Sequence, residues 1–111
     1  MNYIISFYNE RVQADIMDLP ATLAARFFNL ADRMEQSGPN LGEPHTEALG
    51  GGLFELRLKG AEGIARVFYC TLVGRRIVML HSFIKKTQKT PPHERRIAEA
   101  RLKEIKNADI R

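Results

Sequence analysis

Cationic side chains gather in one stretch of the chain, residues 53–91, which reads LFELRLKGAEGIARVFYCTLVGRRIVMLHSFIKKTQKTP. This stretch holds three short apolar runs separated by glycine-containing turns, a pattern that predicts antiparallel β-strands. The side chains there that could act on a charged substrate are Arg57, Lys59, Arg66, His81 and Lys85. Cations that share a sheet repel one another unless a partner supplies negative charge, so the pattern indicates an anionic ligand, with phosphate as the leading candidate.

Metal chemistry has little support in the sequence. Zinc and two-metal sites need several His, Cys or carboxylate ligands at short spacing. The chain has three scattered His, one Cys and no close carboxylate pair at ligand spacing, so we expect no metal and no other cofactor. Cys70 lies inside an apolar run and is predicted to be a small buried hydrophobic residue rather than a catalytic thiol.

The charge of the chain is distributed unevenly along its 111 residues. Residues 1–56 contain three Lys or Arg against eight Asp or Glu, a balance of −5, and residues 57–111 contain fourteen against five, a balance of +9, which together give the net +4. A basic face supplied by the second half suits nucleic acid or an acidic protein segment. The sequence has no apolar run long enough to span a bilayer and no signal region, so we expect a cytoplasmic protein without a membrane partner.

The first 40 residues have to support the strands that carry these cations. Residues 2–8 are rich in β-branched and aromatic side chains and predict an opening strand in the same sheet. Asn9 can cap a first helix, and a second helix follows Pro20. Apolar residues recur at helical spacing on both, as Val12, Ile16 and Leu19 and then as Leu23, Phe27, Leu30, Ala31 and Met34. We expect the two helices to form a hairpin that covers one side of the sheet.

Residues 40–52 are polar and glycine-rich, and we predict a loop in which the three glycines at 50–52 turn the chain into the next strand and His45 faces solvent. The prolines at 91 and 92 lead into a final helix, whose charged face we predict to be solvated. A chain of this length forms one domain, here residues 1–111. The predicted fold class is α+β, a small antiparallel-rich sheet packed with an N-terminal helical hairpin and a C-terminal helix.

Residues 53–59, the first of the three apolar runs, are predicted to present an apolar face and a charged face. Strand alternation places Phe54, Leu56 and Leu58 on one face and Glu55, Arg57 and Lys59 on the other. Arg66 lies in the next apolar run and needs a partner, either Glu55 in a structural ion pair or a phosphate at the sheet surface. Tyr69 falls on the face opposite to Arg66 if no bulge intervenes.

The motifs LFELRLK, ARVFY and IVMLHSFIKKTQKTP, followed by a helical tail, give the chain a family resemblance over nearly its whole length. It resembles the RelE/HigB superfamily of toxin components from bacterial type II toxin–antitoxin pairs, and within it the phage-derived Gp49-like, HigB-type branch. The resemblance implies an endoribonuclease that enters the ribosomal A site and cuts mRNA during translation. It also implies a small helix-turn-helix (HigA-like) antitoxin as partner, with operator DNA contacted only through that antitoxin.

Metal-free RNA cleavage uses the 2′-hydroxyl as an internal nucleophile and requires a base, cations for the developing phosphorane charge and an acid for the leaving 5′ oxygen. The resemblance implies that Arg57 and Lys59 are the basic pair on one strand and that Arg66 contacts the scissile phosphate on the next. A lysine crowded by other cations is more easily deprotonated, so Lys59 or Lys85 can serve as the base.

The remaining candidates each have a functional and a structural interpretation. His81 is the residue type best suited to proton transfer at neutral pH, although a lone histidine in an apolar strand is more often structural. Lys86 and Lys89 are predicted RNA contacts beside the cleft. Tyr69 can stack on a base or donate to a phosphate, although strand tyrosines usually pack in cores.

Two other functions stay open at this point. A ParE-like toxin has a similar topology but acts on DNA gyrase and lacks the cationic catalytic set, so Arg57, Lys59 and Arg66 weigh against it. A non-catalytic RNA-binding or regulatory module would use the basic face without cutting anything. Cations that converge on one concave patch would favour the nuclease, whereas cations that point apart or are neutralised by internal carboxylates would count against it.

Overall fold

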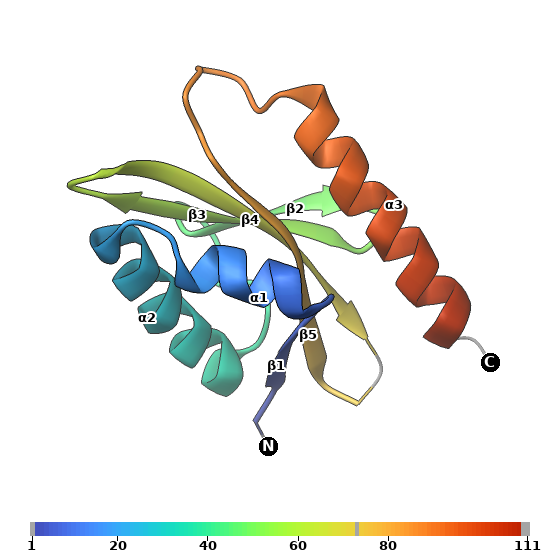
Figure 1. Ribbon diagram of the computed structural model, residues 1–111. Coiled ribbons are helices and arrows are strands. Elements are labelled where there is room, and N and C mark those ends of the chain that lie inside the picture. Colours follow the sequence, from blue (N-terminus) through green and yellow to red (C-terminus); the bar gives the residue numbers. More distant parts are fainter. Residues whose placement is uncertain (1, 73, 110–111) are drawn as a thin grey trace.

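The structure, a computed structural model, describes residues 2–72 and 74–109. In chain order these residues form β1 (Ile4–Phe7), α1 (Glu10–Met17), α2 (Ala21–Ser37), β2 (Thr46–Gly50), β3 (Leu53–Gly60), β4 (Gly63–Leu72), β5 (Arg76–Ile84) and α3 (Pro92–Asp109). The strands form a sheet in the order β1-β5-β4-β3-β2, in which β1 is parallel to β5 and the other neighbours are antiparallel. Helices α1 and α2 lie on one face and α3 on the other (Figure 1). The predicted α+β class is therefore confirmed.

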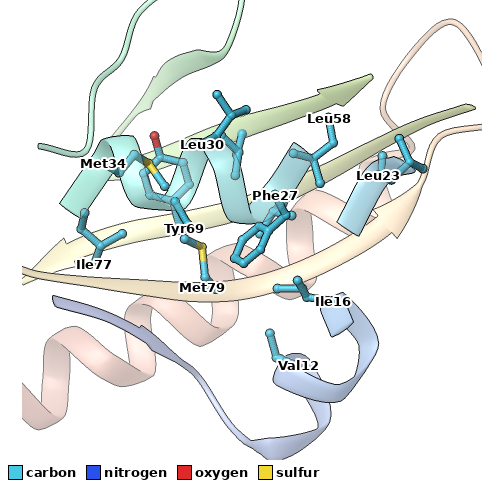
Figure 2. Close-up of a cluster of buried hydrophobic side chains, with 14 residues drawn as sticks. Val12, Ile16, Leu23, Phe27, Leu30, Met34, Leu58, Tyr69, Ile77 and Met79 are labelled. Carbon is cyan, nitrogen blue, oxygen red and sulfur yellow. The ribbon is translucent and has the colours of Figure 1, made fainter. Parts of the chain in front are cut away.

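The face covered by α1 and α2 is closed by apolar side chains. Asn9 caps α1 as predicted, since its side chain accepts a hydrogen bond from the Val12 amide at 2.8 Å. All five residues of the apolar stripe predicted for the second helix are buried. Figure 2 shows this stripe packed against Leu58, Tyr69 and Met79 of the sheet. Burial of each large apolar side chain contributes about 1.5–3 kcal/mol, so this layer is a stable platform for the opposite face.

Residues 40–52 contain a strand that the sequence analysis did not predict. Thr46–Gly50 forms β2 and pairs with β3, which places Glu47 opposite Glu55. Its sequence TEALG lacks the alternation of apolar and polar residues that predicts a strand, because only Thr46 is buried. The predicted glycine turn is confirmed, since the three glycines at 50–52 have φ angles of 93°, 65° and 90°, a region that favours glycine.

A β-bulge in β5 determines where His81 points. The pairing of β5 with β4 skips Leu80, which is an extra residue on β5. Before the bulge, Ile77 and Met79 face α1 and α2, and strict alternation would place His81 beside them. The bulge turns His81 toward the α3 side instead, where its ring stacks on Phe83.

Helix α3 covers only part of its face of the sheet. Ala98 and Leu102 pack with Leu53, Phe68, Cys70 and Leu80, so Cys70 is buried as predicted. In Figure 1, α3 lies over one end of the sheet while the β3–β4 hairpin projects away from it. The charged residues of β3 and β4 lie toward that uncovered end. Within residues 2–72 and 74–109, no helix has the length and apolarity that a bilayer span requires.

Candidate functional site

Two cavities adjoin the uncovered end of the sheet and share Arg57 and Arg66 in their walls. The α3-side cavity, about 360 Å³, is also lined by Glu47, Leu49, Glu55, Phe68, Lys85, Thr90 and Arg95. The α2-side cavity, about 320 Å³, lies at the edge of β3 and is also lined by Arg26, Pro44, His45, Lys59 and Ile64. Of the five residues predicted to be catalytic, the structure thus brings four together, and His81 lies outside both cavities.

Arg57 and Arg66 lie directly opposite each other on β3 and β4, with Glu55 between them. The Oε1 atom of Glu55 is 3.3 Å from Nε of Arg57 and 3.6 Å from Nε of Arg66. Glu55 is buried, with 7% of its surface exposed. A carboxylate in this position offsets the repulsion between two neighbouring guanidinium groups, so the three residues form one charged unit.

Arg57 is held by three carboxylates. Glu43 lies 3.1 Å from its Nη1, Glu47 accepts from its Nη2, and Glu55 accepts from its Nε. Burial alone would lower the pKa of Arg57, but the hydrogen bond to Glu55 and the charges of Glu43 and Glu47 outweigh it and raise the pKa. Internal carboxylates therefore neutralise Arg57, and by the criterion stated above this counts against the predicted catalytic role of this residue. Arg57 is better suited to fasten β2 and the preceding turn to β3 than to bind phosphate directly.

Arg66 is less fully paired. Only 13% of its side chain is exposed, its Nε is buried without a hydrogen-bond partner, and its Nη1 donates to the Ala65 carbonyl at 3.4 Å. Burial lowers the pKa of Arg66, and the charge of Arg57 acts in the same direction against that of Glu55. Glu55, the structural partner that the sequence suggested, lies within ion-pair distance but beyond hydrogen-bond distance. An arginine held in this way retains donor capacity for an anion in either cavity.

The four candidate lysines surround these arginines. Lys85 is half-buried in the wall of the α3-side cavity, where its amide donates to the Ile64 carbonyl at 2.8 Å, and Lys59 is exposed at the α2-side cavity. Lys86 and Lys89 are exposed on the connection from β5 to α3. In the part of the chain that the structure describes, no carboxylate lies within ion-pair distance of any of these four lysines.

His81 has a structural environment. Its Nε2 lies 2.7 Å from Oε1 of Glu94, which belongs to the first turn of α3. Its ring also stacks on Phe83, which in turn stacks on Phe68. The contact fastens the start of α3 to β5 and leaves His81 in the wall of neither cavity. These partners favour the structural interpretation of His81.

Tyr69 lies on the face opposite to Arg66, as strand alternation predicted. It is fully buried beneath α2, its ring stacks on Phe54, and its hydroxyl donates to the Pro39 carbonyl. Burial raises the pKa of this phenol. The prediction that Tyr69 contacts RNA is therefore corrected, because the side chain has no surface left to offer a base or a phosphate.

His45 and Arg95 are among the cavity-lining residues that the sequence analysis missed. His45 was expected to face solvent, but it is half-buried in the α2-side cavity, where burial and then the charges of Arg33 and Arg26 lower its pKa. Arg95 lines the α3-side cavity and donates to the Leu49 carbonyl at 3.3 Å. Helical periodicity could have placed Arg95, since it lies three residues before the buried Ala98. No sequence pattern near His45 predicts that this residue lines a cavity.

The described residues include no group of three or more His, Cys, Asp or Glu that could hold a metal ion. The observed arrangement is instead a sheet that presents cations beside two cavities. Such an arrangement is able to bind an anion and to stabilise negative charge.

The sheet with a helical hairpin on one face and a single helix on the other is the RelE-like toxin fold. The chain is similar to the Escherichia coli toxin RelE, in the free state of a double arginine-to-alanine mutant, with a TM-score of 0.64 and 13% identity over 95% of this chain and 99% of that one. It is also similar to a chain of the archaeal RelE–RelB complex from Pyrococcus horikoshii OT3, with a TM-score of 0.55 and 22% identity over 76% of this chain and 96% of that one.

The family is shown by sequence. The family model described as phage-derived protein Gp49-like (DUF891) matches residues 14–103. The chain therefore belongs to the Gp49-like family, and the resemblance inferred from its motifs is confirmed. No curated protein matches the chain.

Proposed function

We propose that this protein is the toxin of a type II toxin–antitoxin pair and that it cleaves mRNA on the ribosome without a metal. The Gp49-like family match, the RelE-like fold and the clustering of cations at one end of the sheet support this function. Arg66 carries the proposal, because it is a nearly buried, incompletely hydrogen-bonded cation in the wall shared by both cavities. Such a group is suited to a phosphate whose charge increases during reaction.

In the proposed reaction the cations act on one phosphodiester bond. The 2′-hydroxyl oxygen attacks the adjacent phosphorus, the bond from phosphorus to the 5′ oxygen breaks, and the products are a 2′,3′-cyclic phosphate and a 5′-hydroxyl. Arg66 stabilises the charge on the phosphorane, while Lys59 and Lys85, on either side, are placed to exchange protons or contact the strand. Arg57 acts through Glu55 to position Arg66.

The outer residues extend this site. We assign Lys86 and Lys89 to the RNA backbone, since exposed lysines bind phosphates through charge alone. We assign His81 to positioning the start of α3 through Glu94. In this role His81 shapes the α3-side cavity without touching the substrate.

The partners follow from the same proposal. The Pyrococcus horikoshii RelE is described in complex with RelB, and we propose that this protein likewise has a cognate antitoxin, a small helix-turn-helix protein of the HigA type. The antitoxin would carry the contacts to operator DNA. The toxin would act in the cytoplasm, at the ribosomal A site.

The test is to map the 5′ ends of cellular mRNA after induced expression. The wild-type protein is expected to arrest translation and to produce new 5′ ends at defined codon positions. Arg66→Ala should lower cleavage by about 10²–10³-fold, the cost of losing one charge-stabilising group. Arg96→Ala is the matched control, because Arg96 is exposed on α3 and lines neither cavity.

Thermal unfolding of both variants separates lost chemistry from lost folding. Growth arrest with gyrase-linked DNA breaks and intact mRNA would replace the proposal with a ParE-like function. RNA binding without cleavage or arrest would indicate a non-catalytic module instead.

A further inference from the structure

His45 is held rigidly at the point where the chain enters β2. Its amide donates to the Gly42 carbonyl at 3.0 Å, and its carbonyl accepts from the Arg57 amide at 2.8 Å. The backbone on both sides of the side chain is therefore fixed to the site. His45 lines the α2-side cavity, together with Lys59 and Arg66.

Within the described ranges, the ring nitrogens of His45 make no structural contact that would explain the presence of a histidine. Neither nitrogen has a hydrogen-bond partner among the residues that the structure describes. His81 differs, since its Nε2 is engaged by Glu94 at 2.7 Å. His93 differs too, since 70% of its side chain is exposed and it lines neither cavity. Of these three imidazoles, His45 alone combines free nitrogens with a place in the cationic cavity.

The surroundings of His45 favour its neutral form. The charged groups around it are Arg26 and Arg33 from α2, Arg57 and Lys59 from β3, Arg66 from β4, and Glu43 from its own turn. The carboxylate of Glu43 is already paired with Arg57. Burial and the charges of Arg33 and Arg26 lower the pKa of the imidazole, so at neutral pH a ring nitrogen keeps the lone pair that a base requires.

We propose that His45 is the general base of the cleavage reaction and that the α2-side cavity holds the ribose whose 2′-hydroxyl attacks. The assignment rests on the proposed endoribonuclease function. A ring nitrogen of His45 takes the proton of the 2′-hydroxyl as its oxygen bonds to phosphorus. The bond from phosphorus to the 5′ oxygen breaks, and that oxygen takes a proton from the ammonium group of Lys59. Arg66 stabilises the charge on the phosphorane, and exchange with water restores both side chains.

The experiment measures single-turnover cleavage of ribosome-bound mRNA as a function of pH for the wild type, His45→Asn and His93→Asn. Positioned general bases contribute about 10²–10⁴-fold to a rate, so His45→Asn should slow cleavage by that factor. The wild-type rate should fall as acid protonates His45, and this fall should be absent from the His45→Asn profile. His93→Asn should keep the wild-type rate and profile. All three should bind equally to ribosomes programmed with mRNA that carries a 2′-deoxynucleotide at the cut.

Each other result has a defined meaning. A wild-type rate for His45→Asn would overturn the assignment and leave the endoribonuclease function standing. A slow His45→Asn that retains the wild-type pH profile or binds the programmed ribosome weakly would show a structural role and overturn it as well. A wild-type protein that leaves mRNA intact would remove the proposed function and the assignment together.

Discussion

On the face of the sheet covered by α1 and α2, Leu56, Leu58 and Val67 are completely buried, whereas the neighbouring positions Arg57 and Arg66 bring charge to the other face. The difference comes from what covers each face. Two helices close the first face along its length, while α3 packs on one end of the second (Figure 1). The first face supplies the larger apolar cluster and therefore most of the stability. That stability offsets the cost of partly burying cations at the uncovered end of the second face.

The largest expected effect is on stability and concerns the face covered by α1 and α2. Phe27→Ala empties a position that is 1% exposed in the α1/α2 cluster, and loss of such a side chain lowers the free energy of unfolding by about 3–5 kcal/mol. Phe28→Ala, at the next residue of α2, removes a ring that is 46% exposed and should cost about 1 kcal/mol or less. Urea unfolding of the two variants measures both values. Equal losses would show that the cluster in Figure 2 is not the main core.

A smaller effect is expected on the charged face. Glu55→Gln removes the negative charge between Arg57 and Arg66, and we expect it to lower the free energy of unfolding by about 1–3 kcal/mol, because two guanidinium groups then face each other with less compensation. The same change should strengthen binding to a non-cleavable RNA, since an anion has left the cavity wall.

Asp15→Asn is the control for Glu55→Gln. Asp15 pairs with Arg11 on the exposed surface of α1, and such a pair contributes about 0.5 kcal/mol or less. If the two variants unfold alike in urea and bind RNA alike, Glu55 does not join the two arginines into one unit.

The sequence correctly predicted those elements in which the periodicity of apolar residues matches their burial. The stripe of α2, the Asn9 cap and the division between Glu55 and Leu56 in β3 all follow from the spacing of apolar residues. Tyr69 was placed on the correct face for the same reason. Its proposed contact with RNA failed because alternation gives the face of a residue but says nothing of what covers that face.

The site was harder to predict because two long-range features of the sheet shape it. Strand β2 brings Glu47 beside β3, and the turn before it brings Glu43 and His45. Without that strand, neither the neutralisation of Arg57 nor the position of His45 could be foreseen. The bulge at Leu80 turns His81 away from the face that alternation assigns to it. Both features depend on strand pairing, which local spacing does not reveal.

The smallest expected effect is that of a change at Tyr69. It tests whether one face of the sheet serves only stability and the other only RNA binding. Tyr69→Phe removes the hydroxyl that donates to Pro39, so the free energy of unfolding should fall by about 1 kcal/mol while RNA binding stays unchanged. Lys86→Ala should instead leave the free energy of unfolding unchanged and weaken RNA binding, because Lys86 is exposed. Loss of one phosphate contact should lower the slope of the salt dependence of single-strand binding by about 0.7. Urea unfolding and salt titrations of binding to a non-cleavable RNA measure both effects. Weaker RNA binding by Tyr69→Phe at unchanged stability would mean that α2 can move off the sheet to expose the ring, and the separation of a structural face from a binding face would then fail.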